Sequence, residues 1–239
     1  MIERITDETE FETWDSRDIF TVRILSLLKS YGCKYQFATY FKQVVDGKIT
    51  AIMSKLDGDF TLSITDDADS DELVHFFCVT GYTSITCSDK FILGSRYDEG
   101  VVMYSDAKMD YSLVGVTVDE YPKLMDLFNF VDYNTMDFKS WYVDISHRVR
   151  HGTAKAYTLC MGEDIIASGI LSAIIDGHAI ITAVRCGVEF RGMGYGSALV
   201  SAICNDVSGR VHLMRDDGMN EDFYKRLGFV DNGRWRIYR

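Results

Sequence analysis

Residues 179–199 read AIITAVRCGVEFRGMGYGSAL, an apolar β-branched run followed by a glycine-spaced turn and a segment that favours a helix. Gly192, Gly194 and Gly196 let the main chain approach a ligand closely. The unpaired N–H groups at the start of the following helix attract an anion. The stretch therefore predicts a strand, a phosphate-binding turn and a helix, with a purely structural glycine turn as the alternative.

Two other phosphate-binding patterns fit this stretch less well. A dinucleotide fingerprint, Gly-x-Gly-x-x-Gly, requires a third glycine where Ser197 stands, and it follows the first strand of a doubly wound sheet. The chain after Leu199 is too short to supply the remaining strands of such a sheet. A nucleotide-triphosphate loop is excluded because no Gly-Lys-Ser/Thr follows the glycines.

The run from Arg191 to Gly196 resembles the pyrophosphate loop of the GNAT superfamily of acyl-CoA-dependent N-acetyltransferases, whose pattern is Arg/Gln-x-x-Gly-x-Gly/Ala. A second segment, Phe223–Phe229 (FYKRLGF), is similar to the closing Tyr and Gly-Phe motif of that family. The resemblance covers about the C-terminal half of the chain. It implies a GNAT fold there, an acetyl-CoA cofactor and transfer of an acetyl group to an amine.

The resemblance also implies which residues bind coenzyme A. The pantetheine arm would run beside the main chain of the strand before the loop, and the loop itself would hold the pyrophosphate. These cofactor-binding residues are Val184, Arg185 and Cys186 on the strand, and Arg191, Gly192, Met193, Gly194, Tyr195, Gly196 and Ser197 in the loop. Gly187-Val188 stands where the family commonly has His-Pro, a departure that concerns the entry to the loop.

Composition limits the class of protein. The 239 residues are 47% apolar and 13% aromatic, which is ample material for one large or two small globular domains. We expect no membrane span and no signal peptide, because no apolar run reaches about 20 residues and the N-terminus is acidic. The six cysteines form no Cys-x-x-Cys pair, so the sequence suggests neither a disulfide framework nor a zinc site, and a cytoplasmic location is the simplest interpretation.

Charge is distributed unevenly along the chain. Residues 1–110 hold 20 acidic and 11 basic side chains, whereas residues 111–239 hold 16 and 14. The half that resembles a cofactor-binding domain is thus the less negative one. This balance argues against nucleic acid as a partner.

The N-terminal half, residues 1–110, is predicted to form a separate domain. Ser16 or Asp15 caps a predicted helix to Tyr31, and strands are expected at 35–41, 48–56 and 60–65 with Asp-Gly turns between them. A helix at 69–77 and a strand at 84–87 follow. This order resembles a degenerate GNAT domain without the glycine loop. Whether it acts as a lid, a homodimer arm or an inert relic stays open.

The C-terminal half, residues 111–239, is predicted to have the element order of a GNAT domain. Helices are expected at 121–130, with Thr117–Asp119 before the first turn and Pro122 near its start, at 138–151 and at 192–207. Strands are expected at 154–160, 165–175, 178–186 and 211–214. A helix carrying Tyr224 and a final strand or hairpin at 229–239 complete the domain. The predicted fold class is therefore α+β, with a mixed sheet between layers of helices.

Tyr224 is the candidate catalytic residue, as the general acid that protonates the departing thiolate. Its phenol, with an ordinary pKa of about 10, stays protonated at neutral pH. The alternative is a core tyrosine on an amphipathic helix. Asp217 stands where the family often has Asn, which leaves one cofactor contact unassigned. The general base is not identified; a water relay, Asp144 or a histidine of the 141–151 segment remain open.

Residues 141–151, WYVDISHRVRH, are dense in functional groups and are the predicted acceptor site. The acceptor-binding candidates are Trp141, Asp144, His147, Arg148, Arg150 and His151. An arginine would clasp a carboxylate while Asp144 attracts an ammonium group, which points to an amino acid or a similar small zwitterion. The alternative is a solvated helix face anchored by Trp141. We expect no metal, because Arg148 stands where a zinc-binding helix would carry glutamate.

Three classes of function are compatible with these features. The first is an acetyl-CoA-dependent N-acetyltransferase acting on a small-molecule amine. The second is a non-catalytic acyl-CoA sensor, and the third is an interaction protein whose first domain supplies a docking or dimer surface. An intact glycine loop disfavours the third as a complete account.

Overall fold

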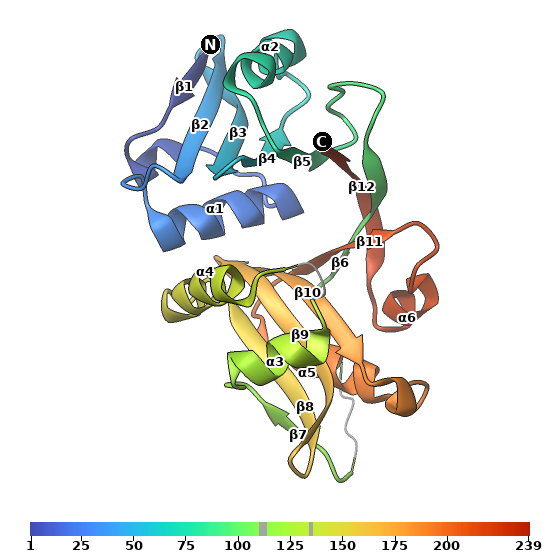
Figure 1. The fold of residues 1–239 in the computed structure, drawn as a ribbon. Coiled ribbons are helices and arrows are strands. Elements are labelled where there is room, and N and C mark those ends of the chain that lie inside the picture. Colours follow the sequence, from blue (N-terminus) through green and yellow to red (C-terminus); the bar gives the residue numbers. More distant parts are fainter. Residues whose placement is uncertain (110–113, 134–135) are drawn as a thin grey trace. The chain divides into compact units, whose positions relative to one another are not determined.

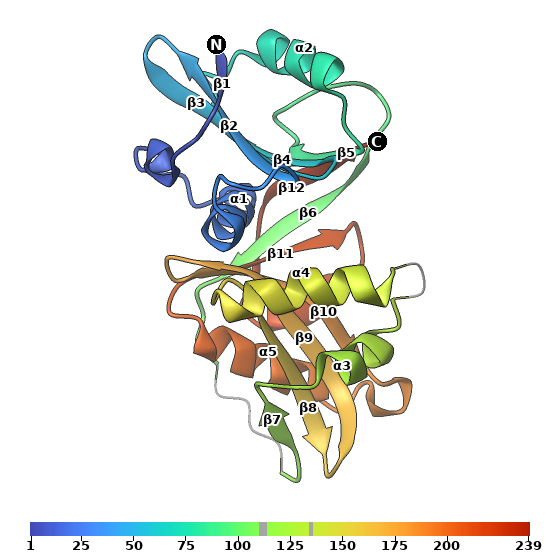
Figure 2. The same ribbon diagram turned by 60° about the vertical axis from the view of Figure 1, so that its left-hand side comes forward.

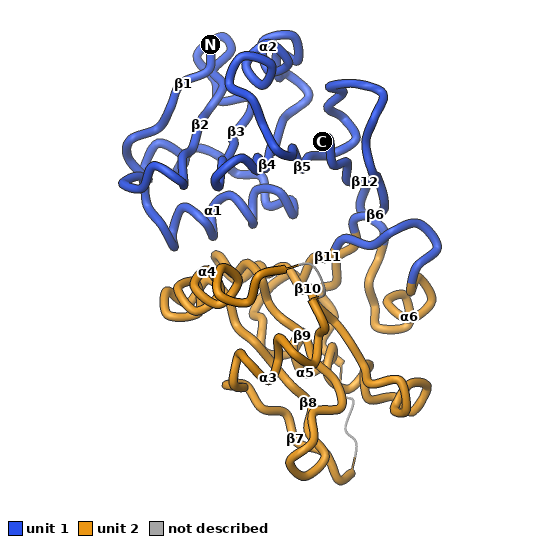
Figure 3. Tube along the Cα trace, in the orientation of Figure 1, with its two compact units in different colours: residues 1–102, 214–219, 231–239 blue, residues 103–213, 220–230 orange. Residues whose placement is uncertain are grey.

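The computed structural model describes residues 1–109, 114–133 and 136–239 and has a mixed α/β fold (Figures 1 and 2). The described residues form twelve β-strands and six α-helices. They fall into two compact units, shown in Figure 3. Unit 1 comprises residues 1–102, 214–219 and 231–239, and unit 2 comprises residues 103–213 and 220–230. The predicted domain boundary at 110 and 111 lies outside the described residues.

Unit 1 contains a sheet with the strand order β1-β2-β3-β4-β5-β12-β6. Most neighbouring strands are antiparallel, and β4 and β5 are parallel. Its elements are β1 (Ile2–Arg4), α1 (Ile19–Tyr31), β2 (Ala38–Val45), β3 (Lys48–Leu56), β4 (Asp59–Ile64), α2 (Ser70–Thr80), β5 (Ser84–Ser88), most of β6 (Asp98–Ser105) and nearly all of β12 (Val230–Tyr238).

Helices α1 and α2 cover opposite faces of this sheet. Successive side chains along β3 point to opposite faces of the sheet. Ile52 packs in an apolar cluster with Leu27 and Leu28 of α1, whereas Met53 packs in a second cluster with Phe77 of α2. The predicted helix, three-strand meander, helix and strand are all present. Strands β1 and β6, and a short 3-10 helix at Glu8–Phe11, were not predicted.

Several boundaries in unit 1 differ from the prediction; α2, for example, ends at Thr80 and not at residue 77. The cap of α1 is Asp18, whose carboxylate accepts from the Thr21 N–H at 2.7 Å, so Ser16 and Asp15 were the wrong candidates. Strand β2 begins at Ala38 and not at residue 35. Tyr35 and Phe37 instead place their rings 6.2 and 5.3 Å from the ring of Tyr31 at the end of α1.

The C-terminal strand β12 was predicted to complete the C-terminal domain, but its residues from Asp231 onward belong to unit 1 and complete the sheet there. It pairs antiparallel with β5, with Trp235 opposite Ser88 and Tyr238 opposite Ile85. The Tyr238 ring is buried in the α2 side of the core, and its hydroxyl donates to the Phe91 carbonyl at 3.0 Å. Unit 1 therefore contains the two ends of the chain.

Unit 2 contains a sheet with the strand order β11-β10-β9-β8-β7, in which β10 and β11 are parallel and the other pairs antiparallel. The order of elements follows the prediction, with one addition, β7. They are β7 (Thr117–Asp119), α3 (Leu124–Val131), α4 (Phe138–Arg150), β8 (Lys155–Met161), β9 (Asp164–Ile175), β10 (His178–Cys186), α5 (Tyr195–Asp206), the first half of β11 (Val211–Asp216) and α6 (Glu221–Arg226).

The start of α3 was predicted too early. Thr117–Asp119 pair with β8 as an edge strand, and the helix begins at Leu124 with Lys123 as its N-cap. Pro122 lies just before the helix. The residue preceding a proline disfavours the α conformation, which keeps Tyr121 outside the helix.

The helices of unit 2 cover both faces of its sheet. On one face Leu127 of α3 and Ile145 of α4 share a cluster with Ala156 and Ile170. On the other face α5 packs so closely on β9 that a Cβ at Gly169 would lie 2.7 Å from Ile203 Cδ1. Figure 2 shows the three layers. Among the helices of the described residues, none is long and apolar enough to cross a membrane.

Candidate active site

The candidate site begins where β10 stops pairing with β11. The two strands are aligned at Ala179 with Val211 and at Ile180 with His212; among the described residues, the rest of β10 pairs with β9 alone. The β9–β10 register also shifts between Thr182 and Arg185, and Ala183 has a φ of +53°, unusual for a residue other than glycine. This part of β10 thus has main-chain groups that β11 does not pair with.

The glycine turn follows the end of β10 and leads into α5. Gly192 and Gly194 have φ values of +77° and +89°, a region where a Cβ atom is strained. Because a positive φ lies outside the α-helical region, α5 begins at Tyr195, later than the predicted Gly192, with Gly194 as its N-cap. The first intrahelical hydrogen bond runs from the Ala198 N–H to the Gly194 carbonyl at 2.9 Å. The N–H groups of Tyr195, Gly196 and Ser197 lie in the first turn and therefore have no acceptor within the helix.

The predicted loop residues are brought together at this turn. A Cβ at Gly192 would meet no described atom within 4 Å, and one at Gly196 would lie 3.6 Å from the Phe223 ring of α6. Arg191 is exposed, and its Nε donates to the Cys186 carbonyl at 3.3 Å. The turn therefore combines an open glycine, a helix N-terminus and a cation, a set suited to an anionic group.

Other predicted cofactor residues lie on the same path. Cys186 is half-buried at the end of β10; its burial raises the pKa of the thiol, while Arg191 lowers it by a smaller amount. Met193 is 59% exposed. The Tyr195 ring lies edge-on to Phe190 at 5.9 Å, and Ser197 is partly exposed.

Arg185 has a side-chain role that the sequence did not indicate. Its guanidinium donates to the Val131 carbonyl at the end of α3 and lies 3.9 Å from the Asp132 carboxylate. Val184 points toward the α5 face of the sheet, since its Cγ2 is 4.0 Å from the Cβ position of Gly169. Arg185 therefore connects the irregular part of β10 to α3.

Tyr224 lies on α6, the short helix after β11. Its ring is partly buried, 4.9 Å from the Phe223 ring and 5.5 Å from the Phe229 ring. Burial raises the pKa of the Tyr224 phenol. The phenol is therefore protonated at neutral pH, as a proton donor must be.

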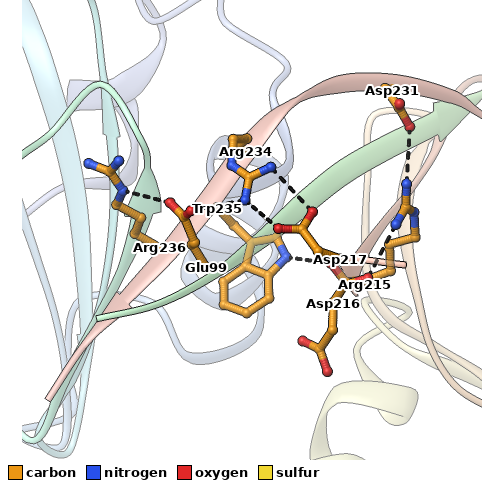
Figure 4. A network of polar contacts seen from close by, with 8 residues as sticks. All are labelled: Glu99, Arg215, Asp216, Asp217, Asp231, Arg234, Trp235 and Arg236. Atoms are coloured by element: carbon orange, nitrogen blue, oxygen red, sulfur yellow. Dashed lines mark hydrogen bonds and ion pairs between the residues drawn. The ribbon is translucent and has the colours of Figure 1, made fainter. Parts of the chain in front are cut away.

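Asp217, at the position where the family often has Asn, belongs to a polar network within unit 1 (Figure 4). Both of its carboxylate oxygens accept from Arg234, at 3.2 and 2.6 Å, and Arg234 also contacts Glu99 at 3.0 Å. These bonds lower the pKa of the Asp217 carboxyl. The structure thus gives Asp217 an ion pair to β12.

The predicted acceptor residues on α4 are largely engaged with one another and with main-chain groups. Arg148 donates to the Ser172 carbonyl and lies 3.5 Å from the Asp144 carboxylate. Arg150 Nε donates to the Ser146 carbonyl at 3.1 Å.

His147 and His151 lie one turn apart, as predicted, with ring centroids 4.1 Å apart, and His151 Nδ1 is 2.8 Å from the His147 carbonyl. Trp141 packs on the α3 and α4 core cluster. In the part of the chain that the structure describes, no group of three or more His, Cys, Asp or Glu residues is arranged to hold a metal ion.

A pair of histidines near the start of β10 and β11, His178 and the buried His212, was not predicted. His212 is fully buried, and neither of its ring nitrogens has a hydrogen-bond partner among the described residues. Its ring centroid lies 6.1 Å from that of His178. The parallel pairing of 178–180 with 210–212 would have revealed this proximity, but a single sequence does not show which strands pair.

Residues 119–229 match the model of the acetyltransferase (GNAT) family. The comparison with curated protein sequences gave no match. Among solved structures, the chain is similar to a GCN5-related N-acetyltransferase from Kribbella flavida, with 14% identity, a TM-score of 0.61 and coverage of 92% of this chain and 93% of that one. A Drosophila protein is 9% identical with a TM-score of 0.67, and 99% of this chain and 97% of that one are covered.

A tandem GNAT protein from the clavulanic acid biosynthesis pathway, solved without acetyl-CoA, is also similar. It is 10% identical, with a TM-score of 0.59 and coverage of 99% and 97% of the two chains. At sequence identities this low, the similarity shows a shared fold alone. The similarity covers nearly the whole chain. Together with the family match, it confirms that the chain carries an acyltransferase domain of the GNAT family, as the glycine turn and the Phe223–Phe229 segment indicated.

Proposed function

We propose that this protein transfers an acetyl group from acetyl-CoA to the primary amine of a small molecule. The observation that carries the proposal is the continuous path from the unpaired part of β10 through Gly192 and Gly194 to the N-terminus of α5. Such a path offers main-chain groups to an amide-containing arm and a cluster of N–H donors to a pyrophosphate. The GNAT family match supports acyl transfer as the reaction class.

Coenzyme A fits the residues of this path. Val184, Arg185 and Cys186 would bind the pantetheine arm through their main chain. The residues from Arg191 to Ser197 would bind the pyrophosphate, where the open space at Gly192 leaves room for phosphate oxygens. When bound, acetyl-CoA supplies an activated thioester whose carbonyl carbon is attacked by an amine.

The protein's own groups have the tasks of positioning and proton transfer. The acceptor amine must lose a proton to attack, and the candidate bases are water, Asp144, His147 and His151. Tyr224 donates a proton to the departing thiolate, a role supported by its protonated phenol. The helix α4 and its C-cap His151, which together carry the six predicted acceptor residues, supply a wall for the acceptor. Six free cysteines fit a reducing compartment such as the cytoplasm.

The N-terminal unit is proposed to be a GNAT-like domain without a cofactor site. It has a parallel β4–β5 pair with α2 between the strands in sequence, which parallels β10, α5 and β11 of unit 2. Where unit 2 has its glycine turn, the stretch before and into α2 carries Asp66, Asp67, Asp69 and Asp71. These carboxylates would repel a pyrophosphate.

The test combines binding and turnover. Calorimetry would measure CoA binding to the wild type, to Gly192→Trp and to Gly162→Trp, while thiol release would measure acetyl-CoA consumption with a panel of amines. Both glycines have positive φ and open surroundings, so Gly162→Trp, in the β8–β9 turn, is a matched control. We expect binding to be lost only in Gly192→Trp.

The outcomes separate the function classes. Turnover with one class of amine supports the enzyme. Binding without turnover with any amine would favour an acyl-CoA sensor, and absence of binding in the wild type would contradict the cofactor assignment.

A further inference from the structure

Five aromatic side chains at the start of α4 and the end of α3 form a cluster that is only partly covered. They are Phe128, Tyr133, Phe138, Trp141 and Tyr142, called here the aromatic cluster. Adjacent rings in it have centroids 5.0 to 5.7 Å apart. The first four side chains are partly exposed, and Tyr142 is 45% exposed. Rings so arranged present faces and edges on which another apolar group can pack.

The aromatic cluster borders the irregular part of β10. Trp141 and Val131 pack on the same core cluster as Ala183, the residue with positive φ in the shifted register. Arg185, two residues further along β10, donates to the Val131 carbonyl. The α3 end of the aromatic cluster is therefore connected to the strand along which the proposed cofactor arm runs.

The charged side chains of α4 lie mostly in its later turns and already have partners. Arg148 contacts the Ser172 carbonyl and the Asp144 carboxylate, and Arg150 contacts the Ser146 carbonyl. A zwitterionic acceptor would have to replace these contacts. An apolar group could pack on the aromatic cluster without disturbing any of them.

We infer that the acceptor is a primary amine with an aromatic or similarly large apolar group, which the aromatic cluster binds while the amino group lies beside the irregular part of β10. This inference rests on the proposed acetyl transfer. It names the substrate class that the charged residues of α4 did not indicate.

The experiment compares amines that share the reacting group and differ in the apolar part. The value of kcat/KM for acetyl-CoA consumption would be measured with 2-phenylethylamine and tryptamine, and with ethylamine and ethanolamine. We expect the aryl amines to be favoured by at least about tenfold, because apolar pockets discriminate by about that factor for even one methylene group. Calorimetry with 2-phenylethylamine in the presence of CoA would report binding independently of turnover.

A variant of the aromatic cluster tests the site itself. Trp141→Leu should reduce the ratio of kcat/KM for 2-phenylethylamine to kcat/KM for ethylamine by at least about tenfold. The conservative variant Trp141→Phe, which keeps an aromatic ring, should retain most of the wild-type ratio. Val143→Ala, an exposed position on the same helix, is the matched control and should leave the ratio unchanged. If Trp141→Leu fails to fold, Tyr142→Ala, at a more exposed ring, provides the same comparison.

Two kinetic results would overturn the inference while leaving the acetyltransferase proposal intact. One is a preference for ethylamine or ethanolamine, and the other is an unchanged ratio in a folded variant of the aromatic cluster. A wild-type protein that binds CoA but not 2-phenylethylamine would also contradict the inference. Absence of CoA binding would instead contradict the proposed function on which it rests.

Discussion

Tyr224 is partly buried between Phe223 and Phe229, and this burial raises the pKa of its phenol. If it protonates the departing thiolate, Tyr224→Phe should lower kcat by about 100-fold, a typical contribution of general acid catalysis, with little change in CoA affinity. Because the folded pKa lies above the ordinary value of about 10, the wild-type rate should show no loss due to this group up to that pH.

Steady-state rates from pH 6 to pH 10 and CoA calorimetry would check this prediction. Tyr121→Phe removes a hydroxyl at an exposed position outside the proposed site and is the control for kcat. A Tyr224→Phe enzyme with wild-type kcat would mean that the tyrosine only fills space.

His212 should make the folded protein sensitive to acid. Burial, followed by the nearby His178 and Arg210, lowers its pKa to about 4. The unfolded chain, with a pKa of about 6.5, binds a proton more readily, so this stability is complete above about pH 6.5 and is lost as pH falls toward 4. The loss amounts to up to about 3 kcal/mol at pH 4.

Urea unfolding at pH 7.5 and pH 4.5 would measure that loss. His212→Leu should lose less stability between the two pH values than the wild type, by about 2 kcal/mol. His75→Gln, at an exposed position on α2, should behave like the wild type. Equal losses in the wild type and His212→Leu would show that His212 is not the responsible group.

Strand β6 passes beneath the indole of Trp235, and this contact depends on one glycine. A Cβ at Gly100 would lie 2.2 Å from the Arg215 carbonyl oxygen and 2.7 Å from the Trp235 ring. That same carbonyl accepts a hydrogen bond from Trp235 Nε1 at 3.1 Å, as Figure 4 shows. A side chain at residue 100 would therefore have no space in the native packing.

Gly100→Ala should lower the free energy of unfolding by about 1 to 3 kcal/mol, the usual cost of overpacking. Gly94→Ala is the matched control, since a Cβ there meets no described atom within 4 Å and its φ is not positive. It should change stability by no more than about 0.5 kcal/mol. Urea unfolding monitored by Trp fluorescence would compare the two; similar values would contradict the packing argument.

Several elements were predictable because their signals are local. Alternation of apolar residues and the Asp46-Gly47 and Asp176-Gly177 turns predict the hairpins, and all four residues of these turns have positive φ. The strand from His178 to Cys186 has its predicted bounds. Strand β7 was missed because three residues at a sheet edge are stabilised by pairing with β8 and not by any pattern of their own.

Unit 1 is built from stretches that are far apart in the sequence, so an N-terminal fragment should not fold by itself. Strand β12, from the C-terminus, supplies the buried Tyr238 and Trp235 and pairs with β5. A fragment of residues 1–110 lacks this strand and leaves an edge of β5 and part of the core exposed. We expect it to be unfolded or aggregated when expressed alone.

Circular dichroism and the dispersion of amide proton NMR signals would check the fragment. A second fragment, in which residues 230–239 are joined to residue 110 through a flexible linker, should recover part of the folded signal. A well-dispersed spectrum from residues 1–110 alone would show that β12 is dispensable for unit 1.

Local sequence was sufficient for the glycine turn, the motif around Tyr224, the order of elements in unit 2 and the acyltransferase class, because each depends on residues close together in the chain. Three features could be seen only in the tertiary structure. They are the end of β10–β11 pairing at Ile180, the contact of Arg185 with α3 and the place of β12 in unit 1. They depend on which distant segments pack together. Which distant segments pack together depends on the burial of apolar surface over the whole chain, and a short sequence pattern does not contain that information.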